Sequence, residues 1–140
     1  MNTYAIVAST DEERDYIDNK LVEFNRSQVS FTQDKNIVLN YVIKNKHDKI
    51  MAGVLSYLYC WKILHVDILF VAEQYRHQGL GRQLLSKVEE EAKILGATLV
   101  HLDTFDFQAK DFYIKMDYQI FGVLDDCPPD HKRYYLRKVL

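Results

Sequence analysis

The sequence predicts an α/β protein built around a mixed β-sheet. An apolar run at residues 65–71 is followed by a polar turn and by an amphipathic stretch that starts at residue 80. A second short apolar run, residues 99–103, comes after that stretch. A strand, a helix and a strand in this order imply parallel pairing of the two strands through a right-handed crossover. Upstream, residues 36–43 and 50–61 are rich in β-branched and aromatic residues and predict an antiparallel hairpin.

Composition limits the classes of protein that the chain can represent. With 140 residues, 48% of them apolar, we expect one globular domain over residues 1–140. A formal charge of −2 gives no general reason to expect a nucleic acid or an anionic membrane as partner. No apolar run approaches the roughly 18 residues that span a membrane, and the start of the chain lacks the features of a signal peptide. We therefore expect a cytoplasmic protein, with Cys60 and Cys127 as free thiols.

The start of the chain is expected to hold one strand and one helix. The apolar run at residues 3–8 predicts an edge strand. Thr10 and Glu13 have the spacing of a capping box, which marks the start of a helix over residues 11–26. Apolar residues at intervals of three and four predict one buried stripe on this helix, made of Ile17, Leu21 and Phe24.

The strand at residues 65–71 carries an acidic residue with two possible interpretations. Side chains alternate along a strand, which predicts one face with His65, Asp67, Leu69 and Val71. The other face is expected to carry Val66, Ile68 and Phe70. Asp67 would then be a carboxylate on a central, buried strand. It is either a hydrogen-bonded structural residue or a general base, because burial raises the pKa of a carboxyl group toward a useful range.

The turn after this strand contains Gly79-Leu80-Gly81 and leads into the amphipathic stretch. Glycine lacks a Cβ atom, so the backbone can approach a ligand closely. The first N–H groups of a helix have no intrahelical partner, and the helix dipole places partial positive charge there. The junction is therefore either a tight turn or a site for an anion such as a pyrophosphate.

The helix after the turn is expected to pack one stripe against the sheet: Leu80, Leu84, Val88, Ala92 and Leu95. The side chains expected to face water are Lys87, Glu89, Glu90 and Lys93. Gly96 is expected to end the helix as a C-cap. Open α/β sheets bind ligands at the carboxyl ends of their strands, and the N-terminus of this helix should lie at that edge.

The turn and a later segment resemble two motifs of one protein family. Arg76, Gly79 and Gly81 match the Arg/Gln-x-x-Gly-x-Gly/Ala motif with which the GNAT superfamily of N-acetyltransferases binds acetyl-CoA. Residues 104–118 resemble a second segment of that family, a short helix that lies beside the thioester. The matching residues there are Ala109, Phe112, Tyr113 and Tyr118.

The sequence departs from the second motif at two positions. Asp106 stands where many members have Asn, which removes an amide that often contacts the cofactor and that Gln108 could replace. Asp117 stands where members have Gly. Because Asp tolerates the left-handed conformation better than most residues, this change need only alter the helix C-cap.

The resemblance implies a GNAT-like fold, a single mixed and splayed β-sheet of about seven strands flanked by about four helices. It implies transfer of an acetyl group from acetyl-CoA to a primary amine by direct attack in a ternary complex, without a metal. Tyr113, otherwise a core aromatic, aligns with the usual general acid. The general base is Asp67, a water or His131. The cofactor-binding residues implied are Leu69, Phe70, Val71, Arg76, His77, Gln78, Gly79, Leu80, Gly81, Arg82 and Gln108.

The end of the chain, residues 118–140, predicts two strands joined by a polar loop with two prolines. In the family such strands form a hairpin that closes the acceptor side. Asp125, Asp126 and Asp130 are expected in this loop, where they are either solvated or attract a cationic amine.

Two other classes of function stay open. One is a non-catalytic acyl-CoA-binding module with a regulatory role. The other is a nucleotide-binding α/β protein, which the sequence disfavours because it has no Gly-x-x-x-x-Gly-Lys-Ser/Thr motif. Leu84 also stands where a GxGxxG motif would have its third glycine. The sequence does not predict the identity of the amine, and a homodimer is suggested only because many relatives form one.

Overall fold

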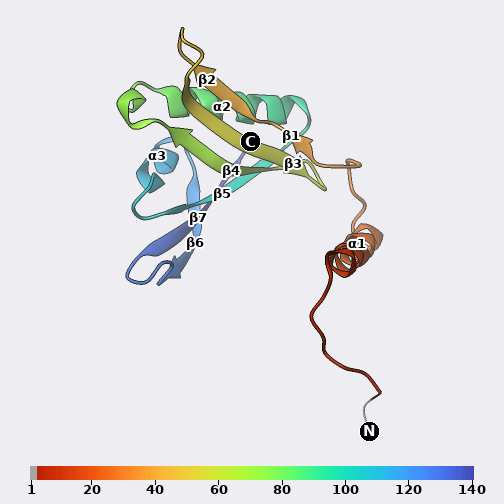
Figure 1. The fold of residues 1–140 in the computed structure, drawn as a ribbon. Coiled ribbons are helices and arrows are strands. Elements are labelled where there is room, and N and C mark those ends of the chain that lie inside the picture. The colour runs from red at the N-terminus through yellow and green to blue at the C-terminus, as the bar shows by residue number, and fades with distance from the viewer. Residues whose placement is uncertain (1–2) are drawn as a thin grey trace. The chain divides into compact units, whose positions relative to one another are not determined.

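The computed structural model describes residues 3–140 and divides the chain into two compact units, Met1–Phe31 and Thr32–Leu140. The first unit holds helix α1 (Asp11–Gln28), shown in Figure 1. The backbone N–H of Glu13 donates to the Thr10 side chain, which confirms the predicted N-cap. The predicted strand at residues 3–8 is wrong. Residues 3–10 have no regular structure, because the described part of this unit offers no second strand to pair with.

The apolar stripe predicted on α1 is not buried. Ile17, Leu21 and Phe24 are all exposed. Helix α1 is the one regular element in the described part of its unit, so nothing within that unit can cover its apolar face.

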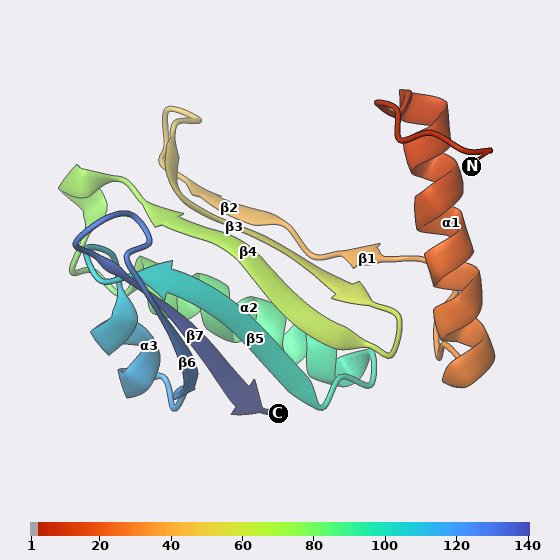
Figure 2. The same cartoon turned by 90° about the horizontal axis from the view of Figure 1, so that it is seen from below.

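The second unit is a seven-stranded mixed sheet with helices, which confirms the predicted fold class (Figures 1 and 2). Its strands are β1 (Ile37–Val38), β2 (Tyr41–Lys44), β3 (Ile50–Tyr59), β4 (Ile63–Val71), β5 (Leu99–Phe105), β6 (Gln119–Asp125) and β7 (Lys132–Val139). Their order across the sheet is β1-β3-β4-β5-β7-β6, and β2 also pairs with β3. Helices α2 (Leu80–Ile94) and α3 (Lys110–Lys115) and the short 3-10 helix η1 (Glu73–Tyr75) complete the unit. With α1, residues 3–140 contain three α-helices where about four were expected.

The strand predicted at residues 36–43 is interrupted, so that it forms β1 and β2 rather than one element. At the interruption, the backbone N–H of Ser56 in β3 donates to the Asn40 side chain over 2.9 Å. The Ser56 hydroxyl donates to the Leu39 carbonyl over 2.5 Å. Side-chain hydrogen bonds thus replace part of the backbone ladder at this point. The predicted C-terminal hairpin is confirmed as β6 and β7, and β7 inserts between β5 and β6.

Strand β4 is central, and its two halves have different neighbours. On one side β4 pairs with β3 in antiparallel fashion along its whole length. On the other side it pairs with β5 in parallel, and only at Leu64 and His65. Beyond His65 the two strands part, which confirms the predicted splay (Figure 1). Within the described sheet, the second half of β4 therefore has one edge without a neighbouring strand.

A β-bulge at Asp67 makes the predicted assignment of strand faces wrong. The pairing with β3 skips Asp67, because Val66 and Ile68 lie opposite consecutive residues of β3. The alternation of side chains shifts by one residue at such a bulge. The core face of β4 therefore continues from Val66 to Leu69 and Val71, which all pack with the core.

Helix α2 packs on β3 and β4 and buries Leu84, Leu85, Val88 and Ala92, which confirms the centre of the predicted stripe. Leu95 at its end is exposed. The C-cap residue is Leu95, and Gly96 follows it in the left-handed conformation with a φ of 102°, so the glycine ends the helix one position later than expected. Among residues 3–140, no helix is long and apolar enough to cross a membrane.

Glu89 does not face water as expected, since it is 7% exposed. The Tyr118 hydroxyl donates to its carboxylate over 2.6 Å, and the Lys138 ammonium donates to it over 2.9 Å. Burial, together with the hydrogen bond to Glu89, raises the pKa of Tyr118. Three distant segments are therefore joined at one buried carboxylate.

Removing this carboxylate should destabilise the fold. Glu89→Ala leaves the Tyr118 hydroxyl and the Lys138 ammonium without their partner in buried surroundings, and we expect a loss of about 3 kcal/mol in the free energy of unfolding. Urea denaturation would show a lower midpoint with an unchanged slope. Glu91→Ala is the control, because it breaks only the Lys87–Glu91 ion pair on the surface of the same helix and should cost less than about 1 kcal/mol. Equal losses in the two variants would contradict the prediction.

Candidate active site

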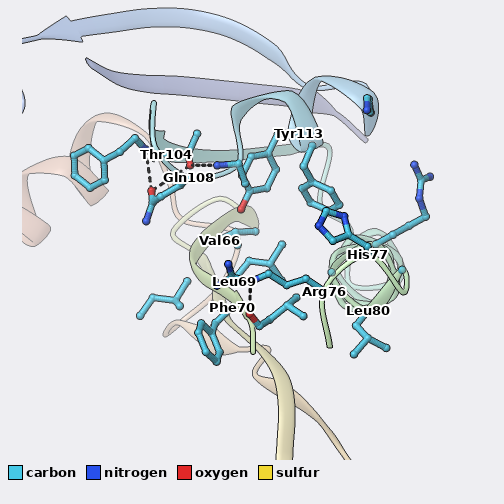
Figure 3. A pocket seen from close by; sticks show the side chains of 18 of the residues that line it. Val66, Leu69, Phe70, Arg76, His77, Leu80, Thr104, Gln108 and Tyr113 are labelled. Atoms are coloured by element: carbon cyan, nitrogen blue, oxygen red, sulfur yellow. Dashed lines mark hydrogen bonds between the residues drawn. The ribbon is translucent and has the colours of Figure 1, made fainter. Parts of the chain in front are cut away.

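A cavity of about 850 Å³ opens where β4 and β5 part. Its walls come from the second half of β4, the turn after it, the start of α2, the end of β5 and helix α3 (Figure 3). Twelve of the thirteen predicted site residues line it: Asp67, Leu69, Phe70, Val71, Arg76, His77, Gly79, Leu80, Gly81, Arg82, Gln108 and Tyr113. Gln78 does not. The fold therefore brings both sequence motifs to one cavity.

The glycine turn forms the N-terminus of α2. Gly79 is the N-cap residue, with a φ of 80° and a ψ of 11°. Glycine is needed there for this left-handed conformation rather than for space, because a Cβ atom built on Gly79 meets no atom within 4 Å. No side chain caps the helix, so the first N–H groups lack a side-chain acceptor. Together with the helix dipole, they make this end of the cavity suitable for an anion.

Two arginines add positive charge at the same end. Arg76 and Arg82 both line the cavity. The Arg76 Nε atom donates to the Val71 carbonyl over 3.1 Å, which ties the turn to the end of β4. Figure 3 shows Arg76, His77 and Leu80 at one end of the cavity and Thr104 and Gln108 at the other.

Tyr113 lies between these two ends, on α3, and its hydroxyl points toward Val66 of β4 (Figure 3). The side chain is 6% exposed and packs edge-on against Phe112 and Tyr118. Burial, and to a smaller extent the charge of Asp103, raises the pKa of Tyr113 to about 12. The phenol is therefore protonated at any physiological pH and available as a donor.

Asp67 lines the cavity, but the expectation that it is buried is wrong. Its side chain is exposed, because the bulge removes it from the regular alternation and β5 no longer covers β4 at this point. Within the part of the chain that the structure describes, Asp67 forms no hydrogen bond or ion pair. Among the described residues it is a carboxylate without a partner.

Asp106 and Gln108 make different contacts in the turn between β5 and α3. Asp106 does not line the cavity. Desolvation acts to raise the pKa of the Asp106 carboxyl. Hydrogen bonds from His131 and the Lys132 backbone nevertheless hold that pKa below its usual value. Gln108 does line the cavity, and its carbonyl oxygen accepts from the Phe105 backbone N–H over 2.8 Å. The left-handed conformation expected at Asp117 is present, with a φ of 71°.

Sequence reasoning missed the residues that β5 and the following turn add to the cavity. Asp103, Phe105 and Phe107 all line it. Arg133 holds the Asp103 carboxylate through two nitrogens, at 2.6 and 2.7 Å. The parallel pairing of β4 with β5 was the signal that could have found Asp103, since carboxyl ends of parallel strands meet at one edge.

The acidic loop lies outside the cavity wall. None of Asp125, Asp126, Asp130 and His131 lines it, and Asp125 is the last residue of β6 rather than part of the loop as expected. Both cysteines are free thiols, as expected. Within residues 3–140, no three His, Cys, Asp or Glu side chains are grouped so that they could hold a metal ion.

Comparison with known proteins identifies the family. The family model of the acetyltransferase (GNAT) domain matches residues 36–120. The chain belongs to the GNAT acetyltransferase family. It is thus an acetyltransferase that depends on acetyl-CoA, the co-substrate of that family.

Its relatives are acetyltransferases as well. This acetyltransferase is 35% identical over 91 residues to blasticidin-S acetyltransferase of Streptomyces morookaense, a match that covers 64% of this chain and 67% of the relative. The crystal structure of an acetyltransferase from Bacillus cereus ATCC 14579 is similar over 100% of both chains, with a TM-score of 0.92 and 38% identity. A proposed streptothricin acetyltransferase from Bacillus anthracis str. Ames, solved with acetyl coenzyme A, shares the fold: its TM-score is 0.65 at 19% identity, over 78% of this chain and 65% of that one.

Replacing Gly79 should weaken acetyl-CoA binding. In Gly79→Ala, the left-handed backbone costs about 1–2 kcal/mol, so the chain is either strained or moves the first turn of α2. We expect a higher dissociation constant for acetyl-CoA by calorimetry and a lower melting temperature. Gly79→Asn should retain more binding, because Asn tolerates this conformation better.

Gly122→Ala in β6 is the matched control. Its φ is not positive, and an added Cβ atom would only touch Tyr135 at 3.7 Å. This variant should bind acetyl-CoA like the wild type. Wild-type affinity in Gly79→Ala would show that the conformation of the turn is not needed for binding.

Proposed function

We propose that this enzyme transfers the acetyl group of acetyl-CoA to a primary amine by direct attack in a ternary complex. The observation that supports this is the shared cavity, which is lined by the α2 N-terminus, the unpaired edge of β4, Asp67 and Tyr113. Cofactor and acceptor can meet there, on either side of the splay. No covalent enzyme intermediate is needed.

The anionic end of the cofactor fits the glycine turn. Backbone N–H groups from Gln78 to Arg82 would hold the pyrophosphate, with added charge from Arg76 and Arg82. The edge of β4 from Leu69 to Val71 would pair with the pantetheine amides as an added strand. A backbone N–H at Phe70 or Val71 would donate to the oxyanion of the tetrahedral intermediate.

The acceptor amine must lose a proton to attack. It would approach Asp67 as a cation, and the Asp67 carboxylate would take the proton, directly or through a water. Because Asp67 is exposed, this role rests on its place in the cavity wall and not on burial. The nitrogen lone pair then attacks the thioester carbonyl carbon, the carbon–sulfur bond breaks, and the nitrogen releases its second proton as the amide forms. The proton first taken by Asp67 would pass to solvent. His131 is disfavoured as the base, because it lies outside the cavity wall and donates to Asp106 over 2.8 Å.

Tyr113 would donate to the leaving sulfur. Complete transfer of a proton from a phenol with a pKa of about 12 to a thiolate with a pKa of about 8.5 costs about 5 kcal/mol. Its first role is therefore a hydrogen bond that stabilises the charge developing on sulfur. The second proton that the nitrogen releases can then protonate the thiolate, so that the products are the amide and the CoA thiol.

The names of the relatives suggest the first acceptors to try. Blasticidin S and streptothricin are acceptors that two of these names indicate. Acetyl transfer would be followed as the release of free CoA thiol, with each amine present and absent. A protein that binds acetyl-CoA and releases no CoA with any amine would favour the non-catalytic binding module instead.

Tyr113→Phe should lower kcat with little effect on acetyl-CoA binding. The variant keeps the buried ring and removes only the donor, and general acids typically contribute about 100-fold or more. Steady-state CoA release and the thermal shift caused by acetyl-CoA measure the two effects separately. Tyr134→Phe is the control, because Tyr134 packs on the core without lining the cavity. Equal kcat values in Tyr113→Phe and the wild type would remove Tyr113 from the mechanism.

Loss of the Tyr113 proton should not lower kcat near pH 10, which is about the pKa of an unperturbed tyrosine. Because burial raises the pKa of Tyr113 to about 12, the phenol stays protonated up to about pH 11. In the wild type, kcat should therefore stay level from about pH 8 to about pH 10. A fall centred near pH 10 that is absent in Tyr113→Phe would contradict this prediction.

A further inference from the structure

We propose that the acceptor carries an aromatic or heteroaromatic ring, which stacks on Phe107 while its cationic amine pairs with Asp67. This inference rests on the proposed transfer to an amine and names the class of acceptor. It is carried by the side chains that sequence reasoning did not anticipate at the end of the cavity away from Arg76 and His77.

The first observation is a pair of stacked rings. Phe105 and Phe107 lie nearly parallel, with an interplanar angle of 5° and ring centroids 5.2 Å apart. Both line the cavity, and Phe107 is 59% exposed. An exposed aromatic ring in a cavity wall is a surface on which another flat ring gains contact area and favourable stacking.

Phe107 is held in place rather than free to collapse onto the protein. Its turn is closed by hydrogen bonds in both directions between Phe105 and Gln108, at 2.8 and 3.0 Å. The His131 ring packs edge-on against Phe107 at 5.3 Å, and Asp106 accepts from His131 over 2.8 Å. The ring is therefore preorganised for contact with a ligand.

The wall formed by β4 is also apolar at this end. The bulge at Asp67 turns Ile68 and Phe70 away from the core face, and they are 49% and 53% exposed. Both line the cavity. Exposed apolar groups that gather in a concave site mark a place where an apolar part of a ligand binds.

The acidic side chains of the cavity wall leave room for one cation. Asp67 and Asp103 are the acidic residues in the described lining, and Arg133 already pairs with Asp103. That leaves one carboxylate, Asp67, for the acceptor. A polyamine or an aminoglycoside carries several cationic groups, most of which would find no partner here. A single amine attached to a flat ring uses both the free carboxylate and the exposed rings.

The test compares amines that differ only in the ring. Phenylethylamine and cyclohexylethylamine carry the same ethylamine chain, and spermidine and kanamycin represent polycations without an aromatic ring. With CoA release as the readout, we expect kcat/KM for phenylethylamine to exceed that for cyclohexylethylamine by about three- to tenfold. Phe107→Leu should remove this preference without changing the KM for acetyl-CoA, and Phe107→Trp should keep it.

Phe121→Leu is the control, because Phe121 is an exposed phenylalanine of β6 that does not line the cavity. It should leave the preference unchanged. Equal values for the two ethylamines, or transfer to spermidine or kanamycin in preference to phenylethylamine, would overturn the proposal and leave acetyl transfer to amines in place. Failure of every amine while acetyl-CoA still binds would instead overturn the proposed function, and this proposal with it.

Discussion

The site depends on the loss of pairing between β4 and β5. The two strands pair only at Leu64 and His65. The residues that line the cavity lie beyond that point on β4 or on the elements that flank the opening. A fully paired parallel sheet would leave no opening between the strands, and the backbone of β4 would have no free edge for a ligand. The bulge at Asp67 lies at the start of the splay and changes which side chains face the opening. The splay thus provides the space and the free edge, and the bulge sets the position of the carboxylate.

The parts of the site that depend on local geometry could be predicted from the sequence. Gly79 marks a left-handed N-cap, and the turn it belongs to needs no distant residue to form. The short helix that carries Tyr113 was expected from the family resemblance, and it is present as α3. The bulge could not be predicted, because β4 carries apolar residues on both faces. A shift of one residue in the alternation therefore leaves no mark in its pattern. A bulge is set by pairing with β3, and the sequence of β4 alone contains no sign of it.

Residues whose environment comes from distant segments were the ones misjudged. Glu89 occupies a position on α2 that suits a solvated carboxylate, and it is buried only because Tyr118 and Lys138 reach it from other elements. The run at residues 3–8 has the composition of a strand but no partner strand in the described part of its unit. In the sequence, Phe107 has no feature that distinguishes it from other loop residues, and in the structure the turn after β5 places it in the cavity wall. In each case the decisive contact is long-range, which a pattern in the sequence does not record.

The distribution of charge in the cavity explains how the two substrates would bind at different parts of it. One end has the uncapped N-terminus of α2, Arg76 and Arg82, which together would attract the anionic part of the cofactor. In the proposed reaction, the unpaired carboxylate of Asp67 would attract the cationic acceptor instead. Because Arg133 neutralises Asp103, a second negative charge does not compete for the acceptor beside Tyr113. The proposed mechanism would therefore direct the polyanionic and the cationic substrate to different parts of one cavity. The thioester of the first would then face the amine of the second where the β4 edge and Tyr113 meet.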